Sequence, residues 1–70
     1  MRYAVIYERT DTGYSAYAPD LPGCVAAGAT LRETERLMRE AIHLHLRAMR
    51  EDGDAIPEPT TVADYIITAA

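Results

Sequence analysis

The stretch TLRETERLMREAIHLHLRAMR, residues 30–50, decides the fold, because it is the one long run in the chain that predicts a helix. Thr30 and Glu33 have the spacing of a capping box, in which the Thr hydroxyl and the Glu carboxylate each satisfy an amide of the first turn. Leu, Met, Ala, Arg and Glu dominate the run, and no Gly or Pro interrupts it before Gly53. We therefore expect a helix that begins after Thr30 and ends near Arg50.

This helix is amphipathic. At about 100° per residue, one broad arc collects the apolar side chains, and Leu46 falls at its wet margin. The members of the apolar arc are Thr34, Leu37, Met38, Ala41, Ile42, Leu44, His45, Ala48 and Met49. The opposite arc holds most of the Arg side chains, several of them four residues from a Glu, which is typical of a solvated helix surface.

The rest of the chain predicts short strands. Residues 2–8 are β-branched and aromatic, and residues 14–18 alternate in the same way after a Gly-containing turn, which together predict a hairpin. Residues 24–28 form a third run. Residues 62–68, VADYIIT, predict a fourth strand after the helix. The order β-β-β-α-β indicates one α+β domain over residues 1–70, with two layers: one long helix on a small, mainly antiparallel sheet.

Tyrosines suggest that this sheet has a second apolar face. In the first strand Tyr3, Val5 and Tyr7 alternate with Ala4 and Ile6, and one helix cannot cover every apolar side chain of the sheet. We expect the uncovered part to be covered by another protein chain. The side chains assigned to this oligomer interface are Tyr3, Tyr7, Tyr17 and Tyr65.

Composition narrows the function classes. The net charge is −4 and the chain has no Lys, which argues against binding to nucleic acid. An acidic surface suits a basic protein partner better. One cysteine excludes an internal disulfide and fits a reducing cytoplasm, and the chain shows neither a signal peptide nor an apolar run long enough to span a membrane.

Three groups of residues could carry chemistry, and each has a simpler explanation. His43 and His45 are two apart and point in different directions on a helix, so they predict no metal site. Cys24 lies in a short strand and is expected to be a small buried side chain. Glu8, Glu40 and Asp64 could form a metal-dependent ribonuclease cluster, but Glu40 lies on the wet arc. We expect no catalytic residue, metal or cofactor.

Two loops remain, PDLPGC at residues 19–24 and EDGDAIPEP at residues 51–59. The prolines remove amide donors and hold the backbone extended or turning. These segments are either ordinary connections or rigid acidic loops that meet a partner, and the residues alone leave both possibilities open.

The combination YxVIYERxxxGYSAYxPDLPGCVAAGxTxxE, followed by EAIHLHLRAMREDGDAIPEP, resembles the HicB-like antitoxins over roughly residues 3–67. The resemblance implies a fold like a partial ribonuclease-H core. It also implies that the chain binds and sterically blocks a small basic HicA-type toxin, which is an mRNA-cleaving ribonuclease, and that it forms homodimers or homotetramers. On this basis we expect the positions that contact the partner or shape its contact surface to be Asp11, Asp20, Leu21, Pro22, Gly23 and Asp54.

The sequence departs from the family's pattern in two ways. Many members carry a C-terminal DNA-binding domain, whereas this sequence stops after the last predicted strand, so we expect no direct DNA binding. Ribonuclease-H enzymes place a metal-binding acid within the first strand, whereas this strand has no acid before Glu8. The alternatives are an oligomeric interaction or small-ligand domain without a toxin, and a weak metal-dependent ribonuclease.

Overall fold

The computed structural model describes residues 1–69, and its dominant element is the helix α1, Leu31–Glu51. Thr30 is the N-cap, and its hydroxyl accepts a hydrogen bond from the Glu33 amide at 3.1 Å. At the other end the Asp54 amide donates to the Met49 carbonyl at 2.8 Å, across Gly53 with a φ of 75°. That left-handed conformation is easy for Gly and ends the helix. The predicted helix and both of its ends are confirmed.

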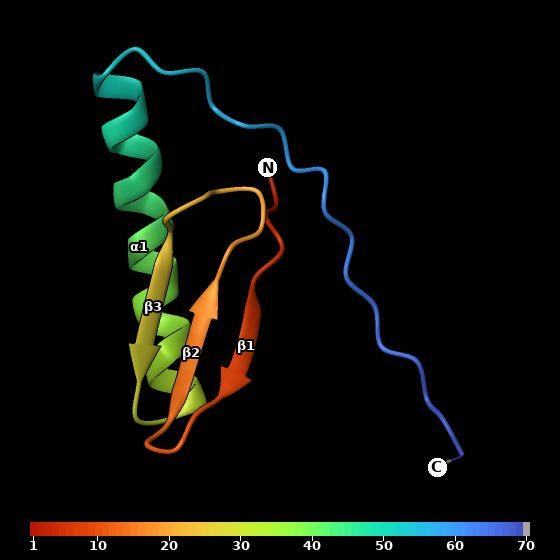
Figure 1. Cartoon of the computed structure of the whole chain (residues 1–70). Coiled ribbons are helices and arrows are strands. Elements are labelled where there is room, and N and C mark those ends of the chain that lie inside the picture. The colour runs from red at the N-terminus through yellow and green to blue at the C-terminus, as the bar shows by residue number, and fades with distance from the viewer. Residues whose placement is uncertain (70) are drawn as a thin grey trace.

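Three antiparallel strands form a sheet in the order β1-β2-β3, with β1 at Ile6–Arg9, β2 at Tyr14–Tyr17 and β3 at Val25–Gly28 (Figure 1). The turn between β1 and β2 is closed by a hydrogen bond from the Thr10 amide to the Gly13 carbonyl at 2.8 Å. One layer of sheet against one layer of helix confirms the predicted α+β class.

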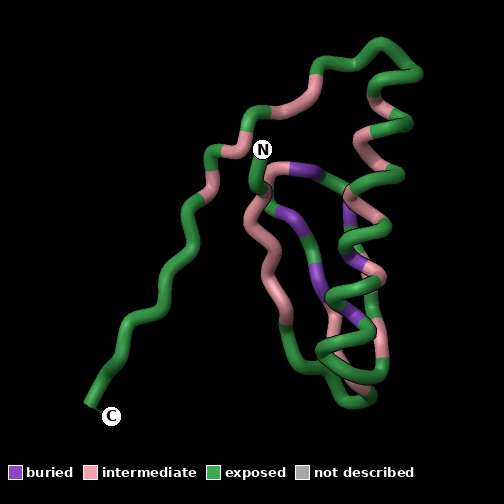
Figure 2. The backbone as a smooth tube through the Cα atoms, turned by 180° about the vertical axis from the view of Figure 1, so that it is seen from behind, coloured by how far each residue is buried: buried purple, intermediate pink, exposed green. Residues whose placement is uncertain are grey.

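The core lies between α1 and the inner face of the sheet, as the tube in Figure 2 shows. Its buried side chains are Ala16, Ala18, Leu21, Cys24, Thr34 and Met38. Tyr3, Val5 and Tyr7 pack against it from the first strand and its approach, which confirms the predicted alternation. On α1, Leu46 also packs against the core, whereas Leu44 is 61% exposed. The predicted position of Leu46 at the wet margin is wrong, because the sheet covers the arc on the Leu46 side rather than the Leu44 side.

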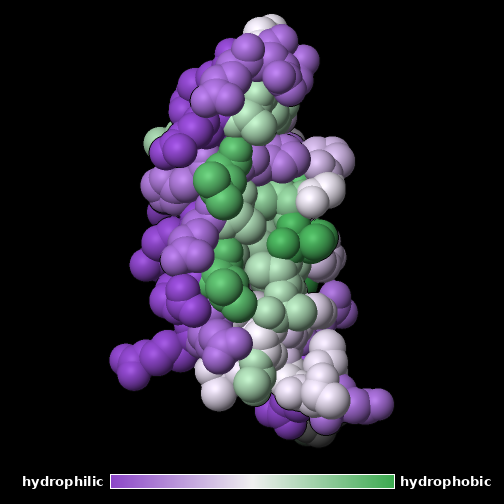
Figure 3. Space-filling model, turned by 90° about the vertical axis from the view of Figure 1, so that its left-hand side faces the viewer, coloured by the Kyte–Doolittle hydropathy of each residue, from purple (hydrophilic) through white to green (hydrophobic). Residues whose placement is uncertain are grey.

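The outer face of the sheet carries an apolar row. The strand register places Ile6, Tyr17 and Val25 side by side across the three strands. Tyr17 is 41% exposed and Val25 63%. On the side of the molecule where α1 lies next to β3, a green apolar band runs beside the purple polar surface (Figure 3). Tyr3 and Tyr7 lie instead on the inner face, so the four tyrosines assigned to one interface do not share a surface.

Strand ends differ from the prediction. β1 begins at Ile6 rather than at residue 2, because β2 ends at Tyr17 and the chain then turns through Pro19. Residues 2–5 therefore have no hydrogen-bonding neighbour along most of their length. β3 begins at Val25, one residue later than predicted, since the Cys24 amide is used inside the loop, where it donates to Leu21.

The fourth predicted strand, residues 62–68, is not a strand in the structure. Residues 54–69, called the tail below, follow α1 without helix or strand. The tail runs alongside β1 in the same direction but stands off from it (Figure 1). Within the described residues, no backbone hydrogen bond joins residues 62–69 to the sheet. A segment with the residue pattern of a strand becomes a strand only where a neighbouring backbone is close enough to form hydrogen bonds with it. Residues 62–68 have no such neighbour in the structure.

Candidate functional site

The loop Ala18–Cys24 is built from two consecutive turns. The Leu21 amide donates to the Ala18 carbonyl at 3.0 Å, and the Cys24 amide donates to the Leu21 carbonyl at 3.0 Å. Leu21 is fully buried and fixes the loop to the core, whereas Pro22 and Gly23 are exposed at its tip. Gly23 has a φ of 85°, a conformation that any other residue would adopt only under strain. The sequence therefore makes this loop rigid.

Asp20 joins this loop to the tail. Its Oδ2 accepts from the backbone amides of Thr60 and Thr61, each at 3.0 Å. Its Oδ1 accepts from the hydroxyls of Thr60 at 3.1 Å and Thr61 at 2.8 Å. One carboxylate thus satisfies four donors, in an arrangement that we call the Asp20 anchor.

The anchor changes the acidity of Asp20. Hydrogen bonds to the ionised carboxylate, from the Thr61 amide first and then from its hydroxyl, lower the pKa of Asp20 below its ordinary value, with Thr60 contributing further. Partial desolvation acts in the opposite direction and is weaker. Asp20 is therefore ionised near neutral pH, and its carboxylate accepts hydrogen bonds instead of donating a proton.

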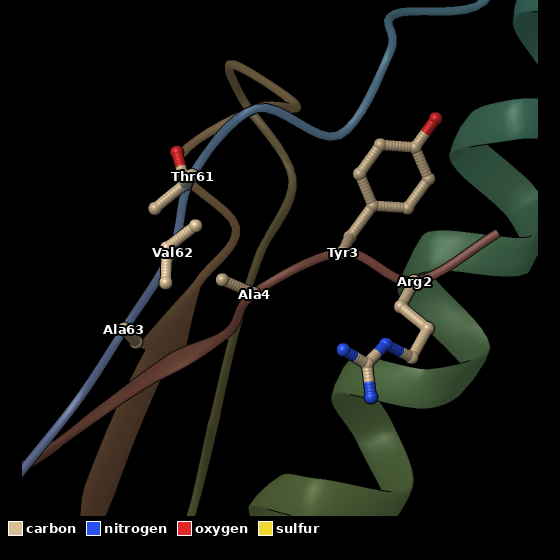
Figure 4. A pocket seen from close by; sticks show the side chains of 6 residues that line it. All are labelled: Arg2, Tyr3, Ala4, Thr61, Val62 and Ala63. Carbon is tan, nitrogen blue, oxygen red and sulfur yellow. The ribbon is translucent and has the colours of Figure 1, made fainter.

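Tyr3 supports the tail at a second point, because its hydroxyl donates to the Pro57 carbonyl. Beyond these supports the tail separates from the sheet. One pocket lies between Arg2–Ala4 and Thr61–Ala63 (Figure 4), and a second lies between Val5–Tyr7 and Ala63–Tyr65. The two pockets follow each other along an open slot between the tail and the first strand.

Acidic side chains gather around the end of α1. Glu51, Asp52, Asp54 and Glu58 are all exposed, within eight positions of the chain. The Asp20 anchor ties the tail just beyond Glu58 to the loop Ala18–Cys24, which exposes Pro22 and Gly23. This part of the surface, which we call the acidic end, combines negative charge with a rigid backbone.

The structure separates the predicted contact residues. Pro22, Gly23 and Asp54 are exposed near the acidic end, whereas Asp11 is exposed in the β1–β2 turn at the opposite end of the sheet (Figure 1). Asp20 is occupied by the tail and Leu21 by the core. These two residues can shape a contact surface, but their side chains are engaged within the chain.

The other candidate groups have structural roles. His43 is exposed and His45 is half-buried, and among residues 1–69 no three His, Cys, Asp or Glu side chains come close enough to hold a metal ion. Glu8, Glu40 and Asp64 are therefore not brought together. Cys24 is buried at 3% exposure, and desolvation raises the pKa of its thiol, as expected for a core residue.

The polar face of α1 is a solvated surface. Arg36 pairs with Glu40 at 3.1 Å and Arg39 with Glu35 at 3.6 Å, both between exposed side chains. Glu35 also lies near Tyr7. Burial, first, and the negative charge of Glu35, second, raise the pKa of the Tyr7 phenol.

Within residues 1–69, no helix has the length and apolarity needed to cross a bilayer.

Sequence reasoning missed Thr60 and Thr61. Two consecutive Thr residues directly after IPEP could have indicated such a contact. Their hydroxyls and the backbone amides of an extended segment are hydrogen-bond donors that need acceptors. Nothing local identifies an acceptor forty residues earlier in the chain.

Comparison with known proteins gives a consistent result. The family model described as the HicB-like antitoxin of bacterial toxin–antitoxin systems matches residues 3–69. A protein of Haemophilus phage HP1, known only as a 14.9 kDa protein of the rep–hol intergenic region, is 38% identical over 66 residues, which are 94% of this chain and 50% of that protein. Antitoxin HicB 2 of Photorhabdus laumondii is 30% identical over 67 residues, which are 96% of this chain and 48% of the antitoxin. The chain spans about half the length of these two relatives.

A solved structure is also similar. One chain of a HicA3 and HicB3 toxin–antitoxin complex superposes with a TM-score of 0.74 at 30% identity, over 86% of this chain and 70% of that one.

Proposed function

Since the chain belongs to the family of HicB-like antitoxins of bacterial toxin–antitoxin systems, we propose that it binds a small basic HicA-type toxin and neutralises it by covering the toxin's active surface. The observation that carries this proposal is the similarity to a chain from a toxin–antitoxin complex, at 30% identity over most of the domain. The domain acts in the cytoplasm as a binding module, without catalysis of its own and without direct contact to DNA.

The acidic end is the surface that suits such a toxin best. Glu51, Asp52, Asp54 and Glu58 are exposed there, on a segment whose continuation is bound to the rigid loop Ala18–Cys24 through Asp20. A positively charged ribonuclease is attracted to such a surface over several ångströms, and complementary charge mainly raises the association rate. A rigid loop also loses little conformational entropy on binding. Asp20 and Leu21 contribute by holding this loop in place.

The exposed Asp11 lies at the other end of the sheet. We include Asp11 among the proposed contact residues as a position separate from the acidic end, and a variant of its own tests it. The domain also forms a homo-oligomer, a dimer or a tetramer, in this proposal. An unpaired sheet edge and exposed apolar side chains support the oligomer.

The test is binding to a HicA-type toxin from the same genome, followed by an RNA-cleavage assay. The wild-type domain is expected to co-purify with the toxin and to stop cleavage at a stoichiometric ratio. The double variant Asp52→Asn/Asp54→Asn should weaken binding roughly tenfold, with a reduced dependence on salt. The matched control is Glu40→Gln, which removes an exposed acid from the polar face of α1 and should leave binding unchanged.

Failure of the wild-type domain to bind any such toxin would overturn the proposal. Asp11→Asn tests that position alone: an unchanged affinity removes Asp11 from the contact surface without affecting the acidic end. If the purified domain cleaved RNA by itself, the non-enzymatic role would be wrong.

A further inference from the structure

Part of the tail carries an unusual surface for a small protein. Val62, Tyr65, Ile66 and Ile67 are 91%, 97%, 83% and 99% exposed. Alternation along an extended backbone puts Val62 and Ile66 on one face and Tyr65 and Ile67 on the other. A segment with large apolar side chains on both faces is typical of a strand that is covered from both sides. The single chain provides neither cover.

The first strand, β1, has an edge with which such a segment could pair. β1 lies at the edge of the sheet, and among residues 1–69 no strand pairs with its outer side. Unpaired edges can pair with another strand, and at the part of this edge that borders the slot Val5, Ile6 and Tyr7 carry no charge and no Pro; the charged Glu8 and Arg9 lie beyond it. The slot described above lies along this edge, with Val5–Tyr7 on one side and Ala63–Tyr65 on the other.

The chain's own tail is kept from closing the slot. The amides of Thr60 and Thr61 donate to Asp20, so they are engaged at the point where the tail comes level with residues 2–4. From there the tail runs in the same direction as β1, with open space between them (Figure 1). The anchor thus fixes both the direction of the tail and its separation from the edge.

We propose that this slot is filled by residues 62–67 of a second copy of the same chain, so that two copies exchange their tails. A two-fold axis between the tails gives the strand order β1, partner tail, own tail, partner β1. Because each tail is parallel to its own β1, the axis makes the inserted tail antiparallel to both of its neighbours. All the new pairings are then antiparallel, and the two sheets of three strands become one continuous sheet.

The geometry of this pair favours a second copy of the same chain as the partner that fills the slot. The segment that needs a partner and the edge that lacks one occur in the same chain, so a two-fold pair satisfies both at once. Each inserted tail pairs with β1 on one side and with the other tail on its second side. The inference specifies the interface of the homo-oligomer proposed above and does not depend on the toxin.

The experiment uses the full chain without toxin. Sedimentation and light scattering should give a dimer, or a tetramer of two dimers. A sample in which isotopically labelled and unlabelled chains are unfolded and refolded together should show intermolecular contacts between residues 63–66 of one copy and Val5–Tyr7 of the other. Amides of residues 62–67 should be protected from hydrogen exchange.

The double variant Ile66→Asp/Ile67→Asp should weaken the oligomer roughly hundredfold, because it replaces apolar side chains on both faces of the inserted strand by charges that would lie beside apolar side chains of the partner's first strand. Its helix content, read from circular dichroism, should persist. Leu44→Asp is the matched control: it places a charge on an exposed apolar residue of α1 and should leave the oligomer intact.

Three outcomes would overturn the exchange. One is a monomer, whether its tail is unprotected or closes on its own β1. Another is an oligomer without contacts between the tail and the partner's first strand. The third is an oligomer that Leu44→Asp dissociates and the tail variant does not. Since toxin is absent from every arm, these results are independent of the binding test for the proposed function.

Discussion

Asp20 and Thr61 lie 41 positions apart in the chain and are joined by two hydrogen bonds, from the Thr61 amide at 3.0 Å and from its hydroxyl at 2.8 Å. Thr60 adds a second pair of bonds to the same carboxylate. This side chain therefore determines where the tail leaves the domain, and the toxin-facing loop and the oligomer interface proposed above both depend on it.

Replacement of Asp20 by Asn should release the start of the tail. Asn keeps the shape, but it has no charge and only one acceptor oxygen, so the four bonds cannot all be kept. We expect the amides of Thr60 and Thr61 to lose most of their protection from hydrogen exchange, with α1 unchanged. Asp11→Asn, which removes an exposed acid from the β1–β2 turn, is the control and should leave that protection as it is. Equal protection in wild type and Asp20→Asn would show that the anchor does not hold the tail.

The anchor should also weaken in acid. Because the hydrogen bonds lower the pKa of Asp20 in the folded chain, its contribution is complete above the ordinary value of 3.8 and is lost as the pH falls through the lower, folded value. The amide resonances of Thr60 and Thr61 should therefore titrate with a midpoint below 3.8. The same resonances in Asp20→Asn should show no such transition. A midpoint at or above the ordinary value would contradict the anchor.

Leu21→Ala should destabilise the fold by about 2–5 kcal/mol, the usual cost of removing a fully buried Leu side chain. That is a large share of the total for so small a domain. Leu44→Ala removes the same atoms from a side chain that is 61% exposed, and it should change the free energy of unfolding by less than about 0.5 kcal/mol. Urea unfolding measures both, and similar losses for the two variants would contradict the described core.

Gly13→Ala should destabilise the turn between β1 and β2. A Cβ at this position would lie 2.1 Å from the Gly28 carbonyl oxygen, so the backbone has to move. We expect a loss of about 1–3 kcal/mol in the free energy of unfolding, as for other overpacked sites. The neighbouring Thr12 is exposed, and Thr12→Ala should be nearly neutral. A neutral Gly13→Ala would mean that β3 and this turn are further apart than described.

Local features of the sequence predicted the helix well. The cap at Thr30, the helix formers that follow and Gly53 all act within a few residues, so nothing distant could change the result. The three antiparallel strands were also predictable, because each is joined to the next by a short connection. Their ends were not, since a strand ends where its neighbour does, as Ile6 and Tyr17 show.

Long-range contacts account for what sequence reasoning could not supply. The family resemblance predicts a contact role for Asp20, whereas its hydrogen-bond donors within the chain, Thr60 and Thr61, come from the other end of the sequence. Residues 62–68 have the composition of a strand, but composition cannot provide the neighbouring backbone that a strand requires. Leu46 was misplaced because periodicity gives the width of an apolar arc more reliably than its centre.

The order of the elements has a consequence for how the protein is made. β2 pairs with β1, β3 pairs with β2, and α1 packs on β2 and β3, so each element contacts an element that comes shortly before it in the sequence. Topologies of this kind fold rapidly. The sheet and α1 can therefore form on the ribosome before the tail has emerged, so the exchange of tails proposed above would follow the folding of this part of the chain.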